Sequence, residues 1–524
     1  MNVEIIKKIQ PVTLSILSAL LLSISLPPSN YPYLAWISFI PFFIALDNQH
    51  NLKSTTILGF LYGAIFSIIT FYGIGEIKVF LYALFYFSFY VSIFAIGIVI
   101  VNRRAKLYSF LFFSSLWWTS LEYMRTIGNL SFPTNIALSQ YKFPFLIQIA
   151  SITGSYGVSF LIMLCNSCLF IVCKYFYNRI ERFYLLRMLY IANGHINKSA
   201  KLLGLETKVF KRKLQDCCSS KDIVYTLLYI IPIIMVFIGY GGVSLSKKEE
   251  ILSINVSIIQ GSIPDWLYGL EKWDEKYSKI IETTYLELTS TAIKKNDSSI
   301  IIWPETPIHR QIMKISYLKN MLLEFSKAGN NFFIVGSPRI DIKRNCKYNS
   351  VFVLSPKGNI IDYYDKTKLV PFVEHFFTPS NEVKIIHASE KLKLGINICF
   401  ESTYPSISRN AVKKGANLLI ISTNDTCLKK TKMSYCHAAN AVFRAVENRR
   451  YVIRAAQSGI SMVINPYGRI LKQSELFKQC VLSGKVGLQE ELTFYTKFGD
   501  LFCYLCIGLS IIFILKSASN RTTE

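Results

Sequence analysis

The sequence predicts a multi-pass α-helical membrane domain joined to a layered α/β domain. Half of the 524 residues are apolar and only 17% are charged, whereas soluble proteins usually carry about a quarter charged residues. The apolar residues are concentrated in residues 10–176, 222–242 and 496–516. Between residues 250 and 490, short β-type runs alternate with helix-type stretches, which favours a layered α/β fold.

The apolar segments divide into eight candidate membrane spans, at residues 10–26, 34–47, 55–75, 78–102, 107–122, 144–176, 222–242 and 496–516. A helix needs about 20 apolar residues to cross hydrocarbon. Two spans are short, and the second is also compatible with a re-entrant segment. The first span follows Lys7 and Lys8 as a signal peptide would, but no small-x-small cleavage site closes it. We therefore interpret it as an anchor.

The distribution of basic residues predicts the orientation. With the N-terminus inside, the cytoplasmic loops carry most of the lysines and arginines, as the positive-inside rule requires. The predicted order is N-terminal transmembrane helices at 1–176, a basic cytoplasmic insert at 177–221, a transmembrane helix at 222–242, an outer domain at 243–495 and a C-terminal transmembrane helix at 496–516. Part of the net charge of +25 is therefore explained by topology and does not call for a nucleic-acid partner.

The outer domain contains eight strand candidates and four helix candidates. The strands are expected at 251–259, 298–303, 331–336, 350–355, 392–398, 417–422, 451–455 and 460–464, and the helices at 274–294, 314–328, 403–414 and 434–449. Three polar residues follow apolar runs of this pattern: Glu305, Lys366 and Cys399. Residues at strand ends are held rigidly at a pocket rim, where chemistry is usually placed.

These three residue types suit nucleophilic catalysis. A free thiol is only a few per cent thiolate at neutral pH, so it needs a base. The carboxylate of Glu305 can take the proton of Cys399 and later return it to a leaving group. The ammonium of Lys366 can stabilise first the thiolate and then an oxyanion. One oxyanion donor is typically worth about 3 kcal/mol, and the backbone N–H of Phe400 is a candidate second donor.

The order of the motifs resembles the nitrilase superfamily. Trp303-Pro304-Glu305, then Lys366 before Leu369-Val370-Pro371-Phe372, then Cys399-Phe400-Glu401 follow that superfamily's Glu-Lys-Cys pattern. The wider context resembles the apolipoprotein N-acyltransferase family. Its motifs include Gln260-Gly261-Ser262-Ile263-Pro264, Tyr348-Asn349-Ser350, Asn424-Asp425, Pro27-Pro28, Glu122-Tyr123-Met124-Arg125 and Gly154-Ser155-Tyr156-Gly157. Together these motifs cover roughly residues 10–176 and 222–515.

The resemblance implies an αββα sandwich with Glu305, Lys366 and Cys399 as the catalytic triad. It also implies supporting roles for Asn349, Glu374, Phe400 and Glu401, although Glu401 could equally be a helix N-terminal charge. A phospholipid would donate an acyl chain to Cys399 as a thioester. The α-amino group of a lipoprotein's diacylglyceryl-cysteine would accept it. The family is found in the bacterial inner membrane, with the catalytic domain on the periplasmic side.

Three positions depart from the family's pattern. Phe400 replaces a usual tyrosine, and Val373 stands where glycine is common. Thr426-Cys427-Leu428 replaces an aromatic and glycine-rich turn. Because that turn lies near the entrance in relatives, these departures bear on substrate preference rather than on the triad.

Other site types find no support in the sequence. We find no phosphate-binding loop, dinucleotide fingerprint, zinc-protease helix or serine nucleophile elbow, and we expect no cofactor. His309, His375, His387 and His437 show no metal-ligand spacing. We interpret all four as structural and expect no metal site.

The insert at 177–221 has no counterpart in the resemblance. It holds ten Lys/Arg against three acids, a net charge of 10 − 3 = +7. The run from Ala192 to Leu205, followed by Lys211-Arg212-Lys213-Leu214, resembles a Fis-type helix-turn-helix. Leu202, Leu203 and Leu205 would then pack between two helices, with Gly204 in the turn. The alternative is a basic amphipathic segment lying on the anionic inner leaflet. We expect membrane contact rather than nucleic-acid binding.

Two other functions fit parts of the sequence. The first is a membrane-tethered C–N hydrolase of the same fold, which would pass the acyl group to water. The second is a membrane-bound regulator whose insert binds DNA, but an intact triad argues against it.

Overall fold

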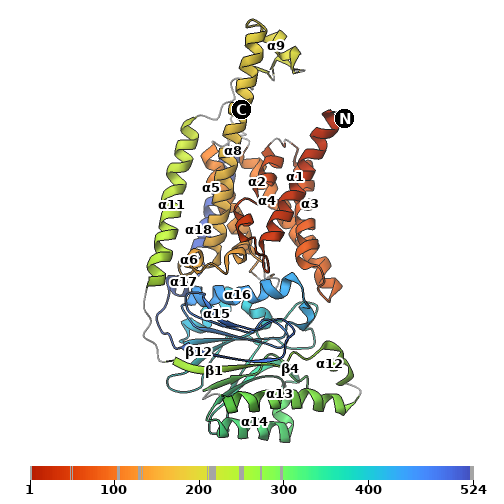
Figure 1. Ribbon diagram of the computed structural model, residues 1–524, viewed down its shortest axis with the longest axis vertical. Coiled ribbons are helices and arrows are strands. Elements are labelled where there is room, and N and C mark those ends of the chain that lie inside the picture. Colours follow the sequence, from red (N-terminus) through yellow and green to blue (C-terminus); the bar gives the residue numbers. More distant parts are fainter. Residues whose placement is uncertain are drawn as a thin grey trace.

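The structure is a computed structural model that describes residues 3–47, 49, 51–102, 107–127, 132, 134–203, 205–208, 210–211, 220–246, 253–271, 274–295 and 299–519. An elongated helical domain stands on a layered α/β domain (Figure 1). The first half of the chain and the C-terminal helix form the helical domain. The strands and their covering helices form the other, so both predicted domain types are confirmed.

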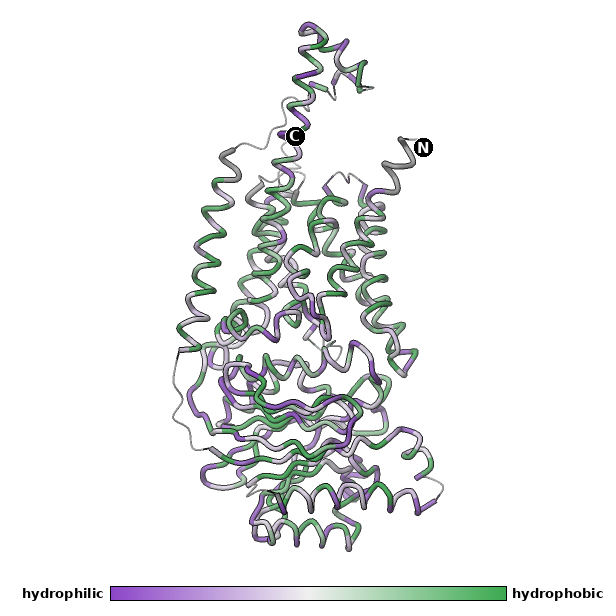
Figure 2. Tube along the Cα trace, in the orientation of Figure 1, coloured by the Kyte–Doolittle hydropathy of each residue, from purple (hydrophilic) through white to green (hydrophobic). Residues whose placement is uncertain are grey.

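The helical domain contains long apolar helices and several short ones. The long helices are α1 (Val3–Ser25), α3 (Leu52–Phe71), α4 (Ile77–Asn102), α5 (Leu107–Met124), α8 (Ser155–Ile191), α11 (Ser220–Ser246) and α18 (Leu501–Ser519). The short ones are η1 (Pro32–Trp36), α2 (Ile40–Asp47), η2 (Ile136–Gln140), α6 (Pro144–Ile147) and α7 (Ala150–Thr153). Among the described residues, α3, α4, α8, α11 and α18 are long and apolar enough to cross a membrane. Figure 2 shows the apolar residues running along these helices.

Two predicted spans differ from the observed helices. The span at 34–47 is divided between η1 and α2. The span at 144–176 begins with the short helices α6 and α7, and α8 starts only after Gly154, whose φ is +68°. Helix α8 then continues to Ile191, beyond the domain boundary expected at residue 176. The continuous apolar run ends near that boundary because Arg179, Glu181 and Arg182 interrupt it. Helix formation does not require a continuous apolar run, so the helix continues.

The insert forms a small helical module at the end opposite the α/β domain (Figure 1). The last turns of α8 pack with α9 (Ile196–Leu202) around a core of Leu185, Ala200 and Phe210. Leu205 packs against this core, as the helix-turn-helix interpretation predicts. Leu202 and Leu203 do not, because their side chains are 55% and 37% exposed. Their predicted packing is therefore wrong, and Gly204 lies outside the described residues.

The α/β domain contains two six-stranded sheets. The first has the strand order β12-β1-β2-β3-β4-β5 and the second β11-β10-β9-β8-β7-β6. The strands of the first sheet are β1 (Ser253–Gln260), β2 (Ile300–Ile302), β3 (Phe332–Asp341), β4 (Cys346–Leu354), β5 (Ile360–Asp365) and β12 (Cys480–Gly487). Those of the second are β6 (Ile385–His387), β7 (Lys393–Ile398), β8 (Leu418–Thr423), β9 (Val452–Ala456), β10 (Met462–Ile464) and β11 (Ile470–Gln473).

The two sheets pack face to face between layers of helices, which confirms the αββα sandwich. Ile302 and Ile334 of the first sheet share one core with Ile420 of the second. Helices α12 (Asp265–Glu271), α13 (Glu275–Lys295) and α14 (Ser316–Ala328) cover the outer face of the first sheet, where Ile301 is buried. Helices α15 (Pro405–Lys413) and α16 (Lys432–Asn448) cover the second sheet on the side of the helical domain (Figure 1). Both faces of each sheet are therefore buried, so its central strands are continuously apolar.

Candidate active site

Glu305, Lys366 and Cys399 come together at one end of the sandwich, on the side of the helical domain. Glu305 follows β2, Lys366 follows β5 directly and Cys399 follows β7 directly. β2 and β7 each pair in parallel with a neighbouring strand, and ligand sites commonly lie beyond the carboxyl ends of such strands. Each sheet therefore contributes to the group.

Lys366 is buried between two carboxylates. Its Nζ lies 3.0 Å from Glu305 Oε1 and 2.9 Å from Glu374 Oε1. The Lys366 side chain is only 1% exposed. Burial lowers the pKa of Lys366, but the two carboxylates outweigh it and hold that pKa well above its ordinary value. Lys366 is therefore a fixed cation at the site.

Asn349 and a backbone amide fix the carboxylates around Lys366. Asn349 Nδ2 donates to Glu305 Oε1 at 2.7 Å and to Glu374 Oε1 at 2.9 Å. The Asn424 amide donates to Glu305 Oε2 at 2.7 Å. Burial raises the pKa of Glu305, while Lys366 opposes that shift. A carboxylate with a raised pKa is a better proton acceptor at neutral pH.

Glu374 has a second task. Its Oε2 accepts a hydrogen bond from the Val370 amide at 2.7 Å. This contact fixes the loop that carries Val370 and Phe372. Glu374 was predicted to support the triad, and its contacts with Lys366 and this loop are consistent with that prediction. Glu374 thus connects the Lys366 cation to that loop.

Glu401 joins the turn of the thiol to the loop after Lys366. Its carboxylate accepts hydrogen bonds from the Ile398 amide at 2.6 Å, the Thr367 amide at 2.6 Å and the Tyr364 hydroxyl at 2.9 Å. The Thr367 hydroxyl donates at 2.6 Å as well. Glu401 lies in the first turn of η4 (Cys399–Thr403), so the helix-terminal interpretation is also correct, but the contacts reach well beyond that turn.

Cys399 occupies a strained turn. Its φ is +50°, in the left-handed region that residues other than glycine rarely adopt. Such a conformation costs about 1–3 kcal/mol and persists where the surroundings impose it, as at active sites. Burial raises the pKa of the Cys399 thiol well above its ordinary value; Glu305 raises it further, and Lys366 partly offsets both. The resting thiol is therefore protonated and needs a base.

Cys399 lines an apolar cavity between the two domains. Phe71, Val79, Tyr82 and Phe132 of the helical domain form one side of the cavity. Val370 and Phe372 of the loop held by Glu374 line it too, together with Phe400. All three departures from the family's pattern lie at this cavity, because Phe400, Val373, Cys427 and Leu428 line it. The cavity gives the thiol access to an apolar substrate from the helical domain.

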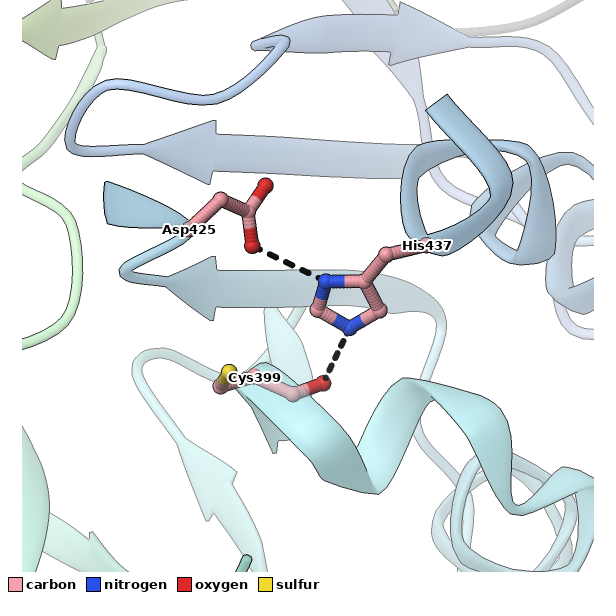
Figure 3. A group of neighbouring side chains, drawn as sticks. All are labelled: Cys399, Asp425 and His437. Carbon is pink, nitrogen blue, oxygen red and sulfur yellow. Dashed lines mark hydrogen bonds and ion pairs between the residues drawn. The ribbon is translucent and has the colours of Figure 1, made fainter. Parts of the chain in front are cut away.

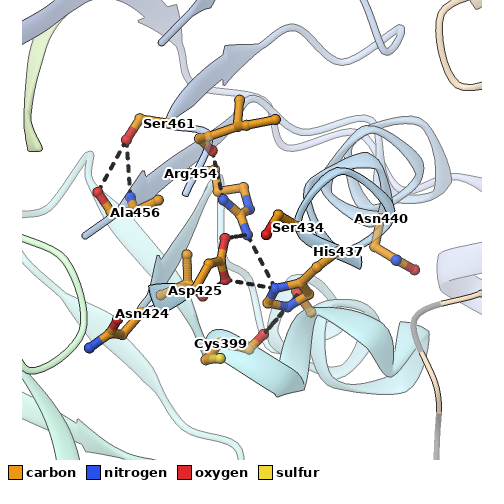
Figure 4. Close-up of polar contacts among 12 residues, drawn as sticks. Cys399, Asn424, Asp425, Ser434, His437, Asn440, Arg454, Ala456 and Ser461 are labelled. Carbon is orange, nitrogen blue, oxygen red and sulfur yellow. Dashed lines mark hydrogen bonds and ion pairs between the residues drawn. The ribbon is translucent and has the colours of Figure 1, made fainter. Parts of the chain in front are cut away.

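His437 is a site residue that sequence reasoning missed. We expected a structural histidine, but its Nε2 lies 3.1 Å from the main-chain oxygen of Cys399 (Figure 3). Its Nδ1 lies 2.9 Å from Asp425 Oδ1. Arg454 Nη2 in turn donates to Asp425 Oδ2 at 2.6 Å (Figure 4). No local spacing could have indicated this contact, because His437 and Cys399 are 38 residues apart.

The other three histidines make different contacts. His309 stacks on Tyr268 with ring centroids 4.1 Å apart, and His375 packs against Phe376. His387 ends β6 and is exposed. Cys399, Asp425 and His437 offer metal-ligating atoms within 4.8 Å of one another. However, Asp425 already pairs with the Arg454 cation. Burial raises the pKa of the Asp425 carboxyl, but Arg454 and His437 lower it by more, so this pKa lies below its ordinary value. The arrangement is that of a hydrogen-bonded chain.

Two family models match the chain. The model of the apolipoprotein N-acyltransferase N-terminal domain matches residues 18–168. The carbon-nitrogen hydrolase model matches residues 255–491. The basic insert and α11 lie between the two matched regions.

Several named proteins are similar over nearly the whole chain. Apolipoprotein N-acyltransferase from Geobacter metallireducens is 30% identical, over 94% of this chain and 93% of that protein. Apolipoprotein N-acyltransferase from Borreliella burgdorferi is 27% identical, over 96% and 94%. Among solved structures, a member of branch 10 of the nitrilase superfamily from Saccharomyces cerevisiae is 19% identical, over 46% of this chain and 93% of that chain, with a TM-score of 0.38.

Proposed function

The chain belongs to the apolipoprotein N-acyltransferase family, and from this premise we propose how its residues move an acyl chain onto a lipoprotein. It is an acyltransferase of lipoprotein maturation, with a nitrilase-type domain and a region of apolar helices. We assign the nucleophile to Cys399, the general base and acid to Glu305, and the oxyanion stabilisation to Lys366. The observation that carries this assignment is that the Cys399 thiol lines an apolar cavity shared with the helical domain.

The first half-reaction forms a thioester. Glu305 takes the proton of the Cys399 thiol, and the sulfur attacks the ester carbonyl carbon of a phospholipid. Lys366 and the Phe400 N–H stabilise the negative charge that develops on the carbonyl oxygen. The ester C–O bond breaks, and Glu305 returns the proton to the departing lysophospholipid oxygen. The acyl chain then lies in the apolar cavity.

The second half-reaction forms the amide. The α-amino group of the diacylglyceryl-cysteine loses a proton to Glu305 and attacks the thioester carbonyl. The C–S bond breaks, and the proton on Glu305 returns to the Cys399 sulfur. Protons and electrons balance over the cycle, so no cofactor is required by this scheme.

The observed arrangement supports an extracytoplasmic position for the α/β domain in the bacterial inner membrane. The basic module of α8 and α9 stands at the opposite end of the helical domain (Figure 1), and basic loops favour the cytoplasm. Thiol labelling of single cysteines at the exposed positions Lys343 and Lys198 tests this topology. An impermeant reagent should reach residue 343 but not residue 198 in intact cells, and the reverse pattern would contradict it.

The chemistry is tested by mass spectrometry of the purified protein. Incubation with phospholipid alone should add one acyl group to Cys399, and later addition of a diacylglyceryl lipopeptide should yield the N-acyl amide. Release of free fatty acid without amide would favour the C–N hydrolase alternative. A Cys399→Ser variant should form neither product, and acyl transfer at the normal rate by this variant would contradict the assignment.

A further inference from the structure

The main chain at the thiol is anchored by a buried side-chain network. His437 Nε2 lies 3.1 Å from the Cys399 carbonyl oxygen, and the Ser402 hydroxyl donates to the same oxygen at 2.8 Å. On the other side of the ring, Nδ1 contacts Asp425. Arg454 binds Asp425 and also donates to the Ile460 carbonyl at 2.6 Å. Figure 4 shows this succession from β9 through the end of β8 to α16 and η4.

The partners of His437 hold its ring on both sides. The Cys399 carbonyl oxygen can only accept, so Nε2 is placed to donate to it. Nε2 also lies 3.1 Å from the Ser402 hydroxyl oxygen, and Nδ1 lies 3.3 Å from Arg454 Nη2. Asp425 is itself held by Arg454 and by the Thr423 hydroxyl at 2.9 Å. All three side chains of the network are at least nine-tenths buried. The ring therefore cannot turn away from Cys399 without breaking contacts on both sides.

The carbonyl that His437 anchors belongs to the peptide between Cys399 and Phe400. A trans peptide is planar, and its C=O and N–H point in opposite directions. Fixing the Cys399 C=O toward His437 therefore fixes the Phe400 N–H to point away from it. That N–H is the second oxyanion donor in the proposed mechanism, so its direction matters for the rate.

We propose that His437, held by Asp425 and Arg454, is a positioning residue that aims the Phe400 N–H at the oxyanion. This inference rests on the proposed acyl transfer. It explains why a charged network is buried beside the thiol. Apolar side chains of similar volume at these positions would usually give a protein of equal or greater stability. It also explains how a residue other than glycine is kept at a positive φ.

The test uses the full-length enzyme and compares two substitutions of His437. His437→Ala removes the anchor, whereas His437→Gln keeps a donor at the position of Nε2. Loss of one oxyanion donor costs about 10²–10³-fold in kcat. We expect His437→Ala to slow acyl-enzyme formation by roughly 10–100-fold, with KM for phospholipid within about 3-fold of wild type. The logarithm of the acylation rate of His437→Gln should lie at least halfway from that of His437→Ala to that of wild type.

The control is Ser434→Ala in the same helix. Ser434 is buried one turn earlier and donates to the Lys429 carbonyl, not to Cys399. This variant should keep the acylation rate, and the melting temperatures of the two His437 variants should agree. A wild-type rate in His437→Ala, or equal loss in His437→Ala and His437→Gln, would overturn the inference.

Two further outcomes separate the inference from its premise. Asp425→Asn and His437→Ala should be non-additive, because both act through the same carbonyl; additive losses would contradict the chain of contacts. If the wild-type enzyme itself forms no acyl-enzyme, the proposed function fails. If it does so and His437→Ala matches it, only the role of His437 fails.

Discussion

The Glu401 carboxylate accepts a hydrogen bond from the Thr367 amide at 2.6 Å and thereby joins the turn of Cys399 to the loop of Lys366. The same carboxylate accepts from the Ile398 amide, immediately before the thiol. Lys366 and Cys399 come from different sheets. Their relative position therefore depends on this bridge as well as on the packing between the sheets.

Glu401→Gln should weaken both the fold and the reaction. A glutamine amide would present its own donors where several donors already converge, and an unsatisfied buried group costs about 1–3 kcal/mol. We expect the melting temperature to fall by roughly 2–10 °C, together with slower acyl-enzyme formation. Exposed Glu390→Gln is the control and should change neither quantity. A Glu401→Gln enzyme with normal stability and rate would show that the bridge is dispensable.

Glu305→Gln and Lys366→Met should separate two functions of the triad. Glu305→Gln removes the base, and we expect acylation to fall by about 10²–10⁴-fold with the fold retained. Lys366→Met removes an oxyanion donor and also leaves Glu305 and Glu374 as buried, unpaired carboxylates. It should therefore lose both activity and stability, the latter by about 3–5 kcal/mol. Single-turnover acylation and thermal unfolding measure the two effects, and activity within a few-fold of wild type for either variant would contradict its role.

The strain at Cys399 should be measurable in inactive variants. Glycine tolerates positive φ whereas alanine does not, so Cys399→Gly should melt roughly 2–6 °C above Cys399→Ala. Ser422 provides a control, because it lies in the regular strand β8. There glycine should be less stable than alanine. The same order at both positions would mean that the turn at Cys399 is not strained.

The fold was predictable where the chain is continuously apolar. β2 and β8 contain runs of Ile and Leu, and β7 places Leu394, Ile396 and Ile398 at alternate positions; nearly all residues of these strands are buried. β5, β11 and β12 form edges of their sheets, and polar residues interrupt each of them, so none of the three was among the predicted strands. Helix α12 and the short strand β6 were missed because they are brief.

The site was predictable only in part. The resemblance indicated Glu305, Lys366 and Cys399, and the structure brings them together. The contacts of Asn349, Glu374 and Glu401 join residues of separate loops, so no local pattern could define them. His437 belongs to the same class, because its partner is a main-chain oxygen that carries no sequence signal.

Activity should decline at acid pH through Glu305. Burial raises the pKa of this carboxyl above its ordinary value of 4.5, so protonation removes the base at a higher pH than for an exposed glutamate. We expect log kcat/KM to rise with unit slope as pH increases through this pKa. The pKa of Lys366 is held well above 10.5, so Lys366 causes no alkaline decline below that pH. If the residual activity of Glu305→Gln shows the same decline at acid pH, that decline belongs to a group other than Glu305.

The module formed by α8 and α9 stands away from the helical domain rather than lying along it. Lys174 pairs with Asp47 at 2.5 Å, which marks the level at which α2 ends. Helix α8 continues for 17 residues beyond Lys174, from 175 to Ile191, a length of about 25 Å at 1.5 Å per residue. Headgroup layers add only about 5–8 Å to each side of the hydrocarbon core. We therefore expect the module to project beyond the headgroups, in contrast to the membrane-surface interpretation of the sequence.

Replacing residues 183–216 by a flexible linker should leave acyl transfer within about 3-fold of wild type. The module lies at the opposite end of the helical domain from the α/β domain that carries Cys399 (Figure 1). No residue of the module can therefore reach the thiol, and any effect would have to pass through α8 and α11. Reversing the charge of exposed Lys198, Lys201 and Lys208 to glutamate is the matched control, because it keeps the module and changes only its charge. A loss of 10-fold or more with the linker but not with the charge reversals would show that the helical packing around Leu185 supports catalysis across the membrane domain. The same loss with both would indicate that an anionic partner of the module controls the enzyme.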